Sequence, residues 1–265
     1  LARRALRAGK HVLVEKPITD SLAGAIELCE LADAGGLTLM VGHVFLFNPA
    51  VRAAKGLLES GELGTVHYIS MRRTNLGPVR RDVNAAWDLA AHDISIASYW
   101  LEAAPRWVAA TGGSWLNPGI EDAVFITMGY PGDVAVHIEA SWLNPRKIRD
   151  IAVVGEARML TIDDMDLGMP LRVYDKGVMS SAPAGVADTF GGFRSQIREG
   201  AITIPKVPQT EPLRAECDAF LARINGFADQ IAGGRAGAAV VAALEAIDLS
   251  LKNGGRQVGL DEVGA

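Results

Sequence analysis

The chain has 265 residues, a net charge of −5 and a pI of 5.6. Hydrophobic residues make up 49% and charged residues 22%, which excludes a disordered chain. The acidic balance gives no reason to expect nucleic acid or an anionic membrane as partner, and no run approaches the roughly 18 apolar residues that cross a bilayer. Cys29 and Cys217 form no Cys-x-x-Cys pair, so we expect reduced residues on or near packed helix faces. We therefore expect a soluble, cytoplasmic protein.

Helix and strand patterns alternate in the first part of the chain. A helical pattern opens it, and the apolar run 11–14 predicts a buried parallel strand. The next helix is predicted to be capped by Thr19 or Asp20 and ended by Gly35-Gly36, before a second strand at 37–41. This alternation is typical of a parallel, doubly wound sheet.

The pattern changes after Asn48-Pro49, where a helix to about Ser60 and a strand at 65–70 are followed by one helix and then a run of strands. The expected later elements are a helix at 90–101, strands at 107–111, 123–130, 134–141, 148–154, 159–162 and 171–174, a loop at 177–192, and helices at 211–231 and 236–252. A run of strands after one helix predicts an α+β arrangement with a mixed, largely antiparallel sheet.

Glu15-Lys16-Pro17 stands at the carboxyl end of the strand predicted at 11–14. Ligands of open α/β sheets bind outside the carboxyl ends of the strands, so a lysine there is placed to contact one. Beside a positively charged nicotinamide ring its pKa would fall, which suits a proton donor or acceptor. An ordinary strand end followed by a proline turn explains the same residues.

Asp88 and His92 are four residues apart at the start of a predicted helix. This spacing places both on one face, where a carboxylate can fix the tautomer of an imidazole and raise its basicity for acid–base catalysis. It equally fits a carboxylate favoured by the helix dipole, with a histidine one turn later. No His-Glu-x-x-His pattern occurs, and we predict no metal site.

Four further polar residues are candidate ligand contacts. His43 and Asn48 lie where the strand at 37–41 opens into a polar-aromatic loop. Asn48 can instead cap the helix that follows it. Arg80 and Arg81, in the loop before Asp88, can hold a phosphate, although a solvated pair of charges explains them as well.

The stretch Ala8-Gly9-Lys10-His11-Val12-Leu13-Val14-Glu15-Lys16-Pro17 resembles the signature of the glucose-fructose oxidoreductase / inositol dehydrogenase / MocA (Gfo/Idh/MocA) family. The loop at 41–49, the Gly61–Gly64 turn, the Asp88-x-x-x-His92 pair and the segment 243–255 follow in that family's order. The resemblance covers essentially the whole chain. It extends to bacterial members assigned to nucleotide sugars through Glu121-Asp122, Ser141-Trp142 and Lys147-x-Arg149.

This resemblance implies a set of site residues. Lys16 and His92 would pass the proton of a substrate hydroxyl, Asp88 would help to position the substrate, and a hydride would move to or from NAD or NADP. The expected cofactor contacts are Glu15, Lys16, Pro17 and His43. The expected substrate contacts are Asn48, Arg80, Asp88 and His92.

One departure concerns the cofactor. The family begins with a Rossmann unit whose Gly-x-Gly-x-x-Gly turn holds the pyrophosphate on backbone amides, and this sequence contains no Gly-x-Gly. We therefore expect an N-terminal truncation that omits about four strands, and weak binding of NAD(P) by the 265 residues alone. Residues 1–48 would be the end of the Rossmann domain. Residues 49–265 would form a substrate-binding and oligomerisation domain, with the closing helices packed back toward the Rossmann part.

The expected activity is NAD(P)-dependent oxidation or reduction of a sugar or nucleotide sugar by a homo-oligomer, a dimer or a tetramer. Two alternatives remain open. One is a non-redox lyase or glycosidase that uses the same lysine and histidine. The other is a non-catalytic sugar-binding or scaffold protein, which the missing glycine turn favours.

Overall fold

The computed structural model describes residues 1–77, 79–178, 197–227 and 231–264. Its elements, in chain order, are α1 (Ala2–Arg7), β1 (Val12–Glu15), α2 (Leu22–Gly35), β2 (Leu39–Gly42), η1 (Val44–Phe47), α3 (Pro49–Glu59), β3 (Val66–Thr74), η2 (Ala86–Ala90), α4 (Ala91–Leu101), β4 (Trp107–Gly113), β5 (Ala123–Gly129), η3 (Pro131–Asp133), β6 (Ala135–Ser141), β7 (Ile148–Gly155), β8 (Met159–Asp163), β9 (Leu171–Tyr174), β10 (Gly177–Val178), β11 (Ile197–Arg198), β12 (Ile202–Thr203), α6 (Pro212–Ile224), α7 (Gly234–Lys252), β13 (Val258–Gly259) and η4 (Leu260–Glu262).

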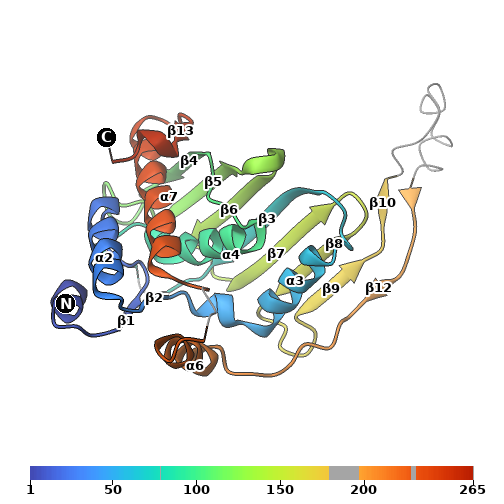
Figure 1. Cartoon of the computed structure of the whole chain (residues 1–265). Coiled ribbons are helices and arrows are strands. Elements are labelled where there is room, and N and C mark those ends of the chain that lie inside the picture. The colour runs from blue at the N-terminus through green and yellow to red at the C-terminus, as the bar shows by residue number, and fades with distance from the viewer. Residues whose placement is uncertain (78, 179–196, 228–230, 265) are drawn as a thin grey trace.

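A small parallel sheet and a large mixed sheet dominate the described fold (Figure 1). β1 and β2 pair in parallel, with α2 packed against them. The large sheet has the order β12-β9-β8-β7-β3-β6-β5-β4-β13, and only β3 and β6 among its described neighbours are parallel. This confirms the predicted fold class, a parallel sheet followed by a mixed, largely antiparallel sheet.

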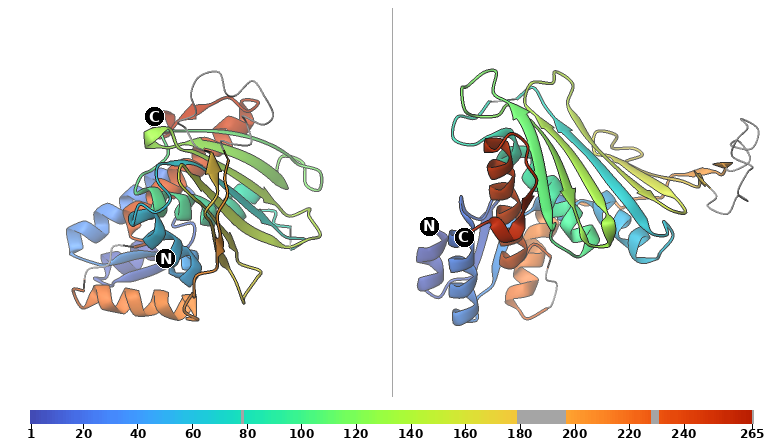
Figure 2. Two further views of the ribbon diagram at one scale, coloured as in Figure 1. Left: turned by 90° about the vertical axis from the view of Figure 1, so that its right-hand side faces the viewer. Right: turned by 90° about the horizontal axis from the view of Figure 1, so that it is seen from above.

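Helices cover one face of the large sheet and leave the other face open (Figure 2). Side chains alternate along the strands, so that Ile69 and Met71 of β3 are buried while Tyr68 is 47% exposed. Helix α7 packs against β4 of the large sheet and also against α2 and β2. It therefore joins the two sheets, and it places the carboxyl ends of β1 and β2 beside the start of α4.

Most of the strands were predicted well, because alternating burial marks each of them. The strand predicted at 171–174 has those bounds, whereas the one predicted at 65–70 continues to Thr74. The edge strand β13 was missed because two residues carry no alternation, and only pairing with β4 defines it. Of the loop predicted at 177–192, residues 179–192 lie outside the described residues, and Gly177–Val178 pairs with β11.

Two predicted helix ends were wrong. Ser21, not Thr19 or Asp20, caps α2, because its Oγ accepts from the backbone amide of Gly24 at 3.3 Å while Thr19 donates to the Ser21 carbonyl. Helix α6 ends at Ile224 rather than near 231. Gly226 follows it with φ +82°, a left-handed conformation that glycine adopts without strain and that stops the helix.

The two cysteines differ. Cys29 is buried in α2, as predicted, whereas Cys217 is exposed on α6, which corrects the expectation that both lie on packed faces. Both are free thiols.

Within the described parts of the chain, the helices are too short or too polar to cross a membrane.

Candidate active site

Lys16 follows β1 directly, and its side chain reaches the turn that carries Asp88. Its Nζ donates to the backbone carbonyl oxygen of Asp88 at 2.7 Å and lies 3.8 Å from Oδ1 of the same residue. Burial lowers the pKa of Lys16 below its ordinary value, and this outweighs the Asp88 carboxylate, which raises it. The ammonium therefore releases its proton more readily than that of a surface lysine.

Asp88 lies in η2, a π-helical turn at the start of α4. The backbone amide of Ala91 donates to the carbonyl of Ala86, five residues back, where an α-helix would use the residue four back. A π turn holds one extra residue, and such turns occur often at functional sites. Here the turn presents the carbonyl oxygen of Asp88 to Lys16.

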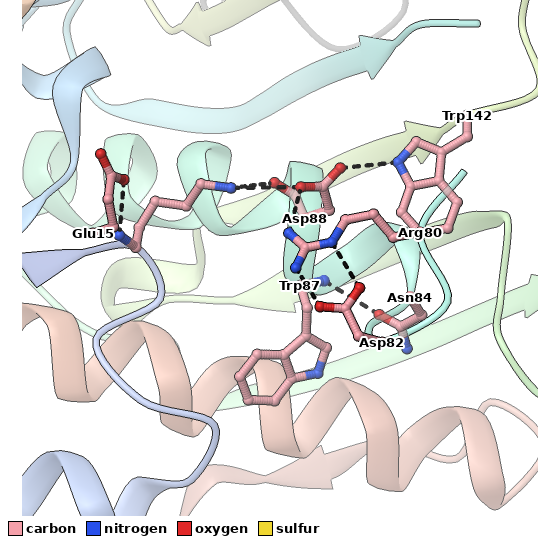
Figure 3. A network of polar contacts seen from close by, with 8 residues as sticks. Glu15, Arg80, Asp82, Asn84, Trp87, Asp88 and Trp142 are labelled. Atoms are coloured by element: carbon pink, nitrogen blue, oxygen red, sulfur yellow. Dashed lines mark hydrogen bonds and ion pairs between the residues drawn. The ribbon is translucent and has the colours of Figure 1, made fainter. Parts of the chain in front are cut away.

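The Asp88 carboxylate is held by residues from outside its own helix (Figure 3). Oδ2 accepts a hydrogen bond from Trp142 Nε1 at 3.0 Å, and Oδ1 lies 3.4 Å from Arg80 Nη1. The Arg80 guanidinium also pairs with Asp82, which resembles the solvated charge pair that the sequence allowed. No phosphate contact is needed to explain the position of Arg80.

The expected pairing of the Asp88 carboxylate with the His92 ring is wrong. Among the described residues, buried Nδ1 of His92 has no hydrogen-bond partner, and the carboxylate turns to Trp142 and Arg80. The physical reason is the π turn, since an extra residue breaks the α-helical register that brings positions i and i+4 together.

His92 instead contacts aromatic and cationic groups. Its ring meets Phe45 edge to face, with centroids 4.9 Å apart. Burial lowers the pKa of His92 well below its ordinary value, and the positive charges of Arg73 and Lys16 lower it further. The imidazole is therefore neutral at pH 7, and a neutral imidazole can accept a proton from a hydroxyl.

A buried ion pair supports this side of the site. Arg73 of β3 forms two hydrogen bonds with Asp93, at 2.9 and 2.8 Å, and both side chains are almost wholly buried. The guanidinium of Arg73 lies 4.3 Å from the ring centroid of Phe45, and that of Arg149 lies 5.4 Å from it. Sequence reasoning missed Arg73, Asp93 and Phe45, because no spacing rule connects a strand residue to a helix residue 20 positions later.

The remaining predicted cofactor contacts lie around β1 and β2. Glu15 is exposed at the end of β1, and its Oε2 accepts from the backbone amide of Lys16 at 3.2 Å. Pro17 follows through a cis peptide bond. His43 is 1% exposed, and neither of its ring nitrogens has a hydrogen-bond partner in the part of the chain that the structure describes. Burial, with a smaller contribution from Lys16, lowers the pKa of His43 to about 4.

Asn48 caps α3, because its Oδ1 accepts from the backbone amide of Ala50 at 2.9 Å. The capping explanation that the sequence left open is thus confirmed. Its Nδ2 donates to Asp164 at 2.9 Å, and the residue lines a cavity of about 1120 Å³. Lys16, Asp88 and Arg80 form one network. Asn48 belongs to another, because it bonds Asp164, Asp164 pairs with Arg149, and the guanidinium of Arg149 lies over the Phe45 ring.

Comparisons with known proteins identify both parts of the chain. Residues 1–43 match the family model "Oxidoreductase family, NAD-binding Rossmann fold", and residues 51–161 match the model "GFO/IDH/MocA C-terminal domain". A UDP-N-acetylglucosamine 3-dehydrogenase from Acidithiobacillus ferrooxidans is 26% identical over 257 residues, which cover 95% of this chain and 76% of that protein. The uncharacterized oxidoreductase YrbE of Bacillus subtilis is 28% identical over 53% of this chain, and the matched region spans less than half of YrbE, 44% of its length.

Solved structures show the same fold. The Acidithiobacillus dehydrogenase superposes with a TM-score of 0.77 at 22% identity, over 95% of this chain and 74% of that one. An inositol dehydrogenase homologue from Azotobacter vinelandii, solved with NADH and myo-inositol, gives 0.73 at 20% identity, over 97% and 74%. The two family models, found in their expected order on the two sheets, identify this chain as a member of the Gfo/Idh/MocA family of oxidoreductases.

Proposed function

We propose that this chain carries the catalytic groups of an NAD(P)-dependent sugar oxidoreductase, in which Lys16 and His92 exchange the proton of a substrate hydroxyl. The observation that carries the proposal is the position of Lys16. It is a mostly buried lysine of lowered pKa at the carboxyl end of a parallel strand, hydrogen-bonded to the turn that leads to His92. The dehydrogenase and inositol dehydrogenase relatives support a sugar or a nucleotide sugar as substrate.

The residues present fit the nicotinamide end of the cofactor. Glu15 ends β1 and Lys16 and Pro17 follow it, at the edge where parallel sheets bind ligands. The buried Nδ1 of His92 has no partner among the described residues and keeps a hydrogen-bonding position. NAD or NADP, when bound, accepts or supplies the hydride. The chain's own residues handle the proton, and Gly-x-Gly does not occur among them to hold the pyrophosphate.

Each side chain has a separate part in the proposed reaction. In the oxidative direction, Lys16 or the imidazole of His92 accepts the hydroxyl proton, and their lowered pKa values favour the unprotonated forms that this step needs. Asp88 faces Lys16 with its backbone carbonyl and holds its carboxylate on Trp142 and Arg80, which positions it to orient substrate hydroxyls. Arg80 and Asn48 are proposed substrate contacts, and His43 is a proposed cofactor contact.

Replacing Lys16 with methionine tests the proposal, because methionine keeps the stem and removes the ammonium. General acid–base catalysis contributes about 10²–10⁴-fold, so kcat should fall within that range while cofactor affinity changes little. The assay uses the protein as its gene encodes it, with NAD and NADP and with candidate nucleotide sugars and inositols.

A matched control is Lys176→Met, an exposed lysine after β9 on the large sheet, which should leave kcat unchanged. His92→Asn should also lower kcat, and the double variant should cost less than the sum, because both residues serve one proton transfer. Wild-type turnover by Lys16→Met would remove the catalytic assignment. Thermal melts of each variant separate lost chemistry from lost folding.

We also propose that residues 1–48 and 49–265 are separate functional units, and that the open face of the large sheet forms a homo-oligomer. Tyr68 of β3 and Phe125 of β5 are 47% and 44% exposed on the two strands that flank β6, and exposed apolar surface can mark an interface. Light scattering of Phe125→Glu should then give a smaller particle than the wild type. An unchanged mass would contradict this surface.

A further inference from the structure

Helix α7 holds the π turn from the side away from Lys16. Nε1 of Trp87 donates to Oδ2 of Asp248 at 2.8 Å, and Trp87 is 8% exposed. The side chains of Trp87 and Asp88 leave the turn in opposite directions (Figure 3). Lys16 bonds the backbone carbonyl of Asp88, and Asp248 bonds the indole of Trp87, so both act on the same turn. Neither the proton-transfer proposal nor the predicted site residues make use of Asp248.

The same carboxylate also anchors the residue that begins the turn. Oδ1 of Asp248 accepts from Nδ2 of Asn84 at 3.0 Å. Asn84 in turn accepts from two backbone amides: its Oδ1 from Trp87 at 3.2 Å, and its carbonyl from Asp88 at 3.2 Å. Glu121 secures the turn's entry, because it accepts from Nδ2 of Asn84 and, through its carbonyl, from the amide of Ala85. The bond from the Asp88 amide to the Asn84 carbonyl therefore ties the backbone of Asp88 to the residue that Asp248 holds.

We propose that Asp248 is a positioning residue, which fixes the carbonyl of Asp88 against Nζ of Lys16 by holding Trp87 and Asn84. Its effect on catalysis rests on the proposed function, whereas its effect on the surroundings of Lys16 does not.

The chemistry of Asp248 supports this assignment. Burial raises its pKa, and the hydrogen bonds from Trp87 and Asn84 oppose that rise, so the carboxylate is desolvated and held by the turn itself. Lys252 lies close enough to favour its charge, and Glu121 disfavours it. Apolar packing alone could join α7 to η2 at a lower desolvation cost. Because one oxygen of Asp248 bonds Trp87 and the other bonds Asn84, the carboxylate fixes the orientation of the turn as well as its position.

The first test measures Lys16 without any turnover. Competitive labelling of the intact protein with acetic anhydride, read by mass spectrometry across pH, gives the apparent pKa of the Lys16 amine. Asp88, Glu15, Arg80 and Arg73 are the charged groups that act on it. In Asp248→Ala the loosened turn admits water. Because burial is the largest influence on Lys16, its titration should move to higher pH, with a smaller movement in Asp248→Asn, which keeps one acceptor.

The second test is kinetic. Asp248→Ala should lower kcat about 10-fold, less than the 10²-fold that a displacement of about 1 Å can cost, and its pH–rate limb should follow the labelling shift. Trp87→Phe removes the indole donor and should reproduce these effects. The double variant should then be little worse than either single one. Asp33→Ala removes an exposed carboxylate that pairs with Arg235 of α7. It serves as the matched control and should change neither the Lys16 titration nor kcat.

The two proposals fail in different ways. If the wild type transfers no hydride but the labelling of Lys16 shifts in Asp248→Ala, the proposed reaction fails and the positioning role stands. If Asp248→Ala lowers the melting temperature while the Lys16 titration stays in place or moves to lower pH, Asp248 is only a structural residue and the inference is overturned.

Discussion

Asp88 and His92 lie four residues apart at the start of one helix, yet their surroundings are opposite. Asp88 is held by Lys16, Trp142 and Arg80. His92 has a buried, unpartnered Nδ1 and lies against Phe45. His43, which directly follows β2, also has two buried ring nitrogens without a hydrogen-bond partner among the described residues.

The difference separates two tasks. Hydrogen bonds fix the geometry around Asp88, whereas desolvation and positive charge set the protonation of the imidazoles. A carboxylate with several donors resists movement, and a ring without partners is ready to bind a ligand group. Predictions that disturb one set of residues and leave the other intact test whether these tasks are truly separate.

The largest effect on stability should come from the buried Arg73–Asp93 ion pair, which lies on the His92 side of the site. Arg73→Leu leaves the Asp93 carboxylate buried without its partner, so the free energy of unfolding should fall by about 3–5 kcal/mol. Urea denaturation followed by circular dichroism measures this. The pair variant Arg73→Met with Asp93→Leu removes both charges and should cost less than either single change. A loss below about 1 kcal/mol in Arg73→Leu would mean that water or another group replaces the pair.

The next effect concerns the pH dependence of stability, through His43. Its pKa is about 4 in the folded protein and 6.5 in an unfolded chain. Above pH 6.5 both states hold the ring neutral. Between pH 6.5 and 4 only the unfolded chain binds the proton, so stability should fall by about 3 kcal/mol as the pH falls through this window.

His43→Leu should flatten that part of the stability curve, measured by denaturation at several pH values. The exposed His67, replaced by glutamine, provides a control that should leave the slope unchanged. An equally steep slope in His43→Leu would assign the acid sensitivity to other groups, of which His92 is the first to examine.

The smallest effect is expected on the Asp88 side. The Arg80 side chain is 42% exposed and shares its charge between Asp82 and Asp88, so Arg80→Gln should change the free energy of unfolding by less than about 1 kcal/mol. The remaining difference should shrink further in high salt. If Arg80→Gln instead costs as much as Arg73→Leu, the geometry of Asp88 depends on a surface charge, and the two sides of the site are not separate.

The sequence predicted the fold well where local patterns decide it. Alternating burial marks the strands of the large sheet, and the carboxyl end of β1 marks Lys16 as a candidate. The partners of the site residues could not be predicted in the same way. Trp142 reaches Asp88 across 54 positions, and Asp248 reaches Trp87 across 161, so only tertiary packing connects them.

The π turn was missed for a different reason. Its sequence, Ala-Trp-Asp-Leu-Ala, contains no residue that distinguishes it from an ordinary helix, and a regular helix was predicted from residue 90 onward. Its wider register follows from the bonds that Asn84, Lys16 and Trp87 make with other elements. Spacing rules assume a regular helix, and for this reason the expected Asp88–His92 pair was wrong.

The extra residue of this turn also bears on how such a site tolerates change in length. Successive positions in an α-helix are rotated by about 100° around its axis. Deleting a single alanine between Asp88 and His92 would let the segment return to regular α-helical winding without removing any functional group. All the side chains of α4 would then have to rotate relative to Asp88, or Asp88 relative to them. The register of this short segment is therefore as much a determinant of the site as the identity of its residues, and alignments that place a gap here compare different geometries.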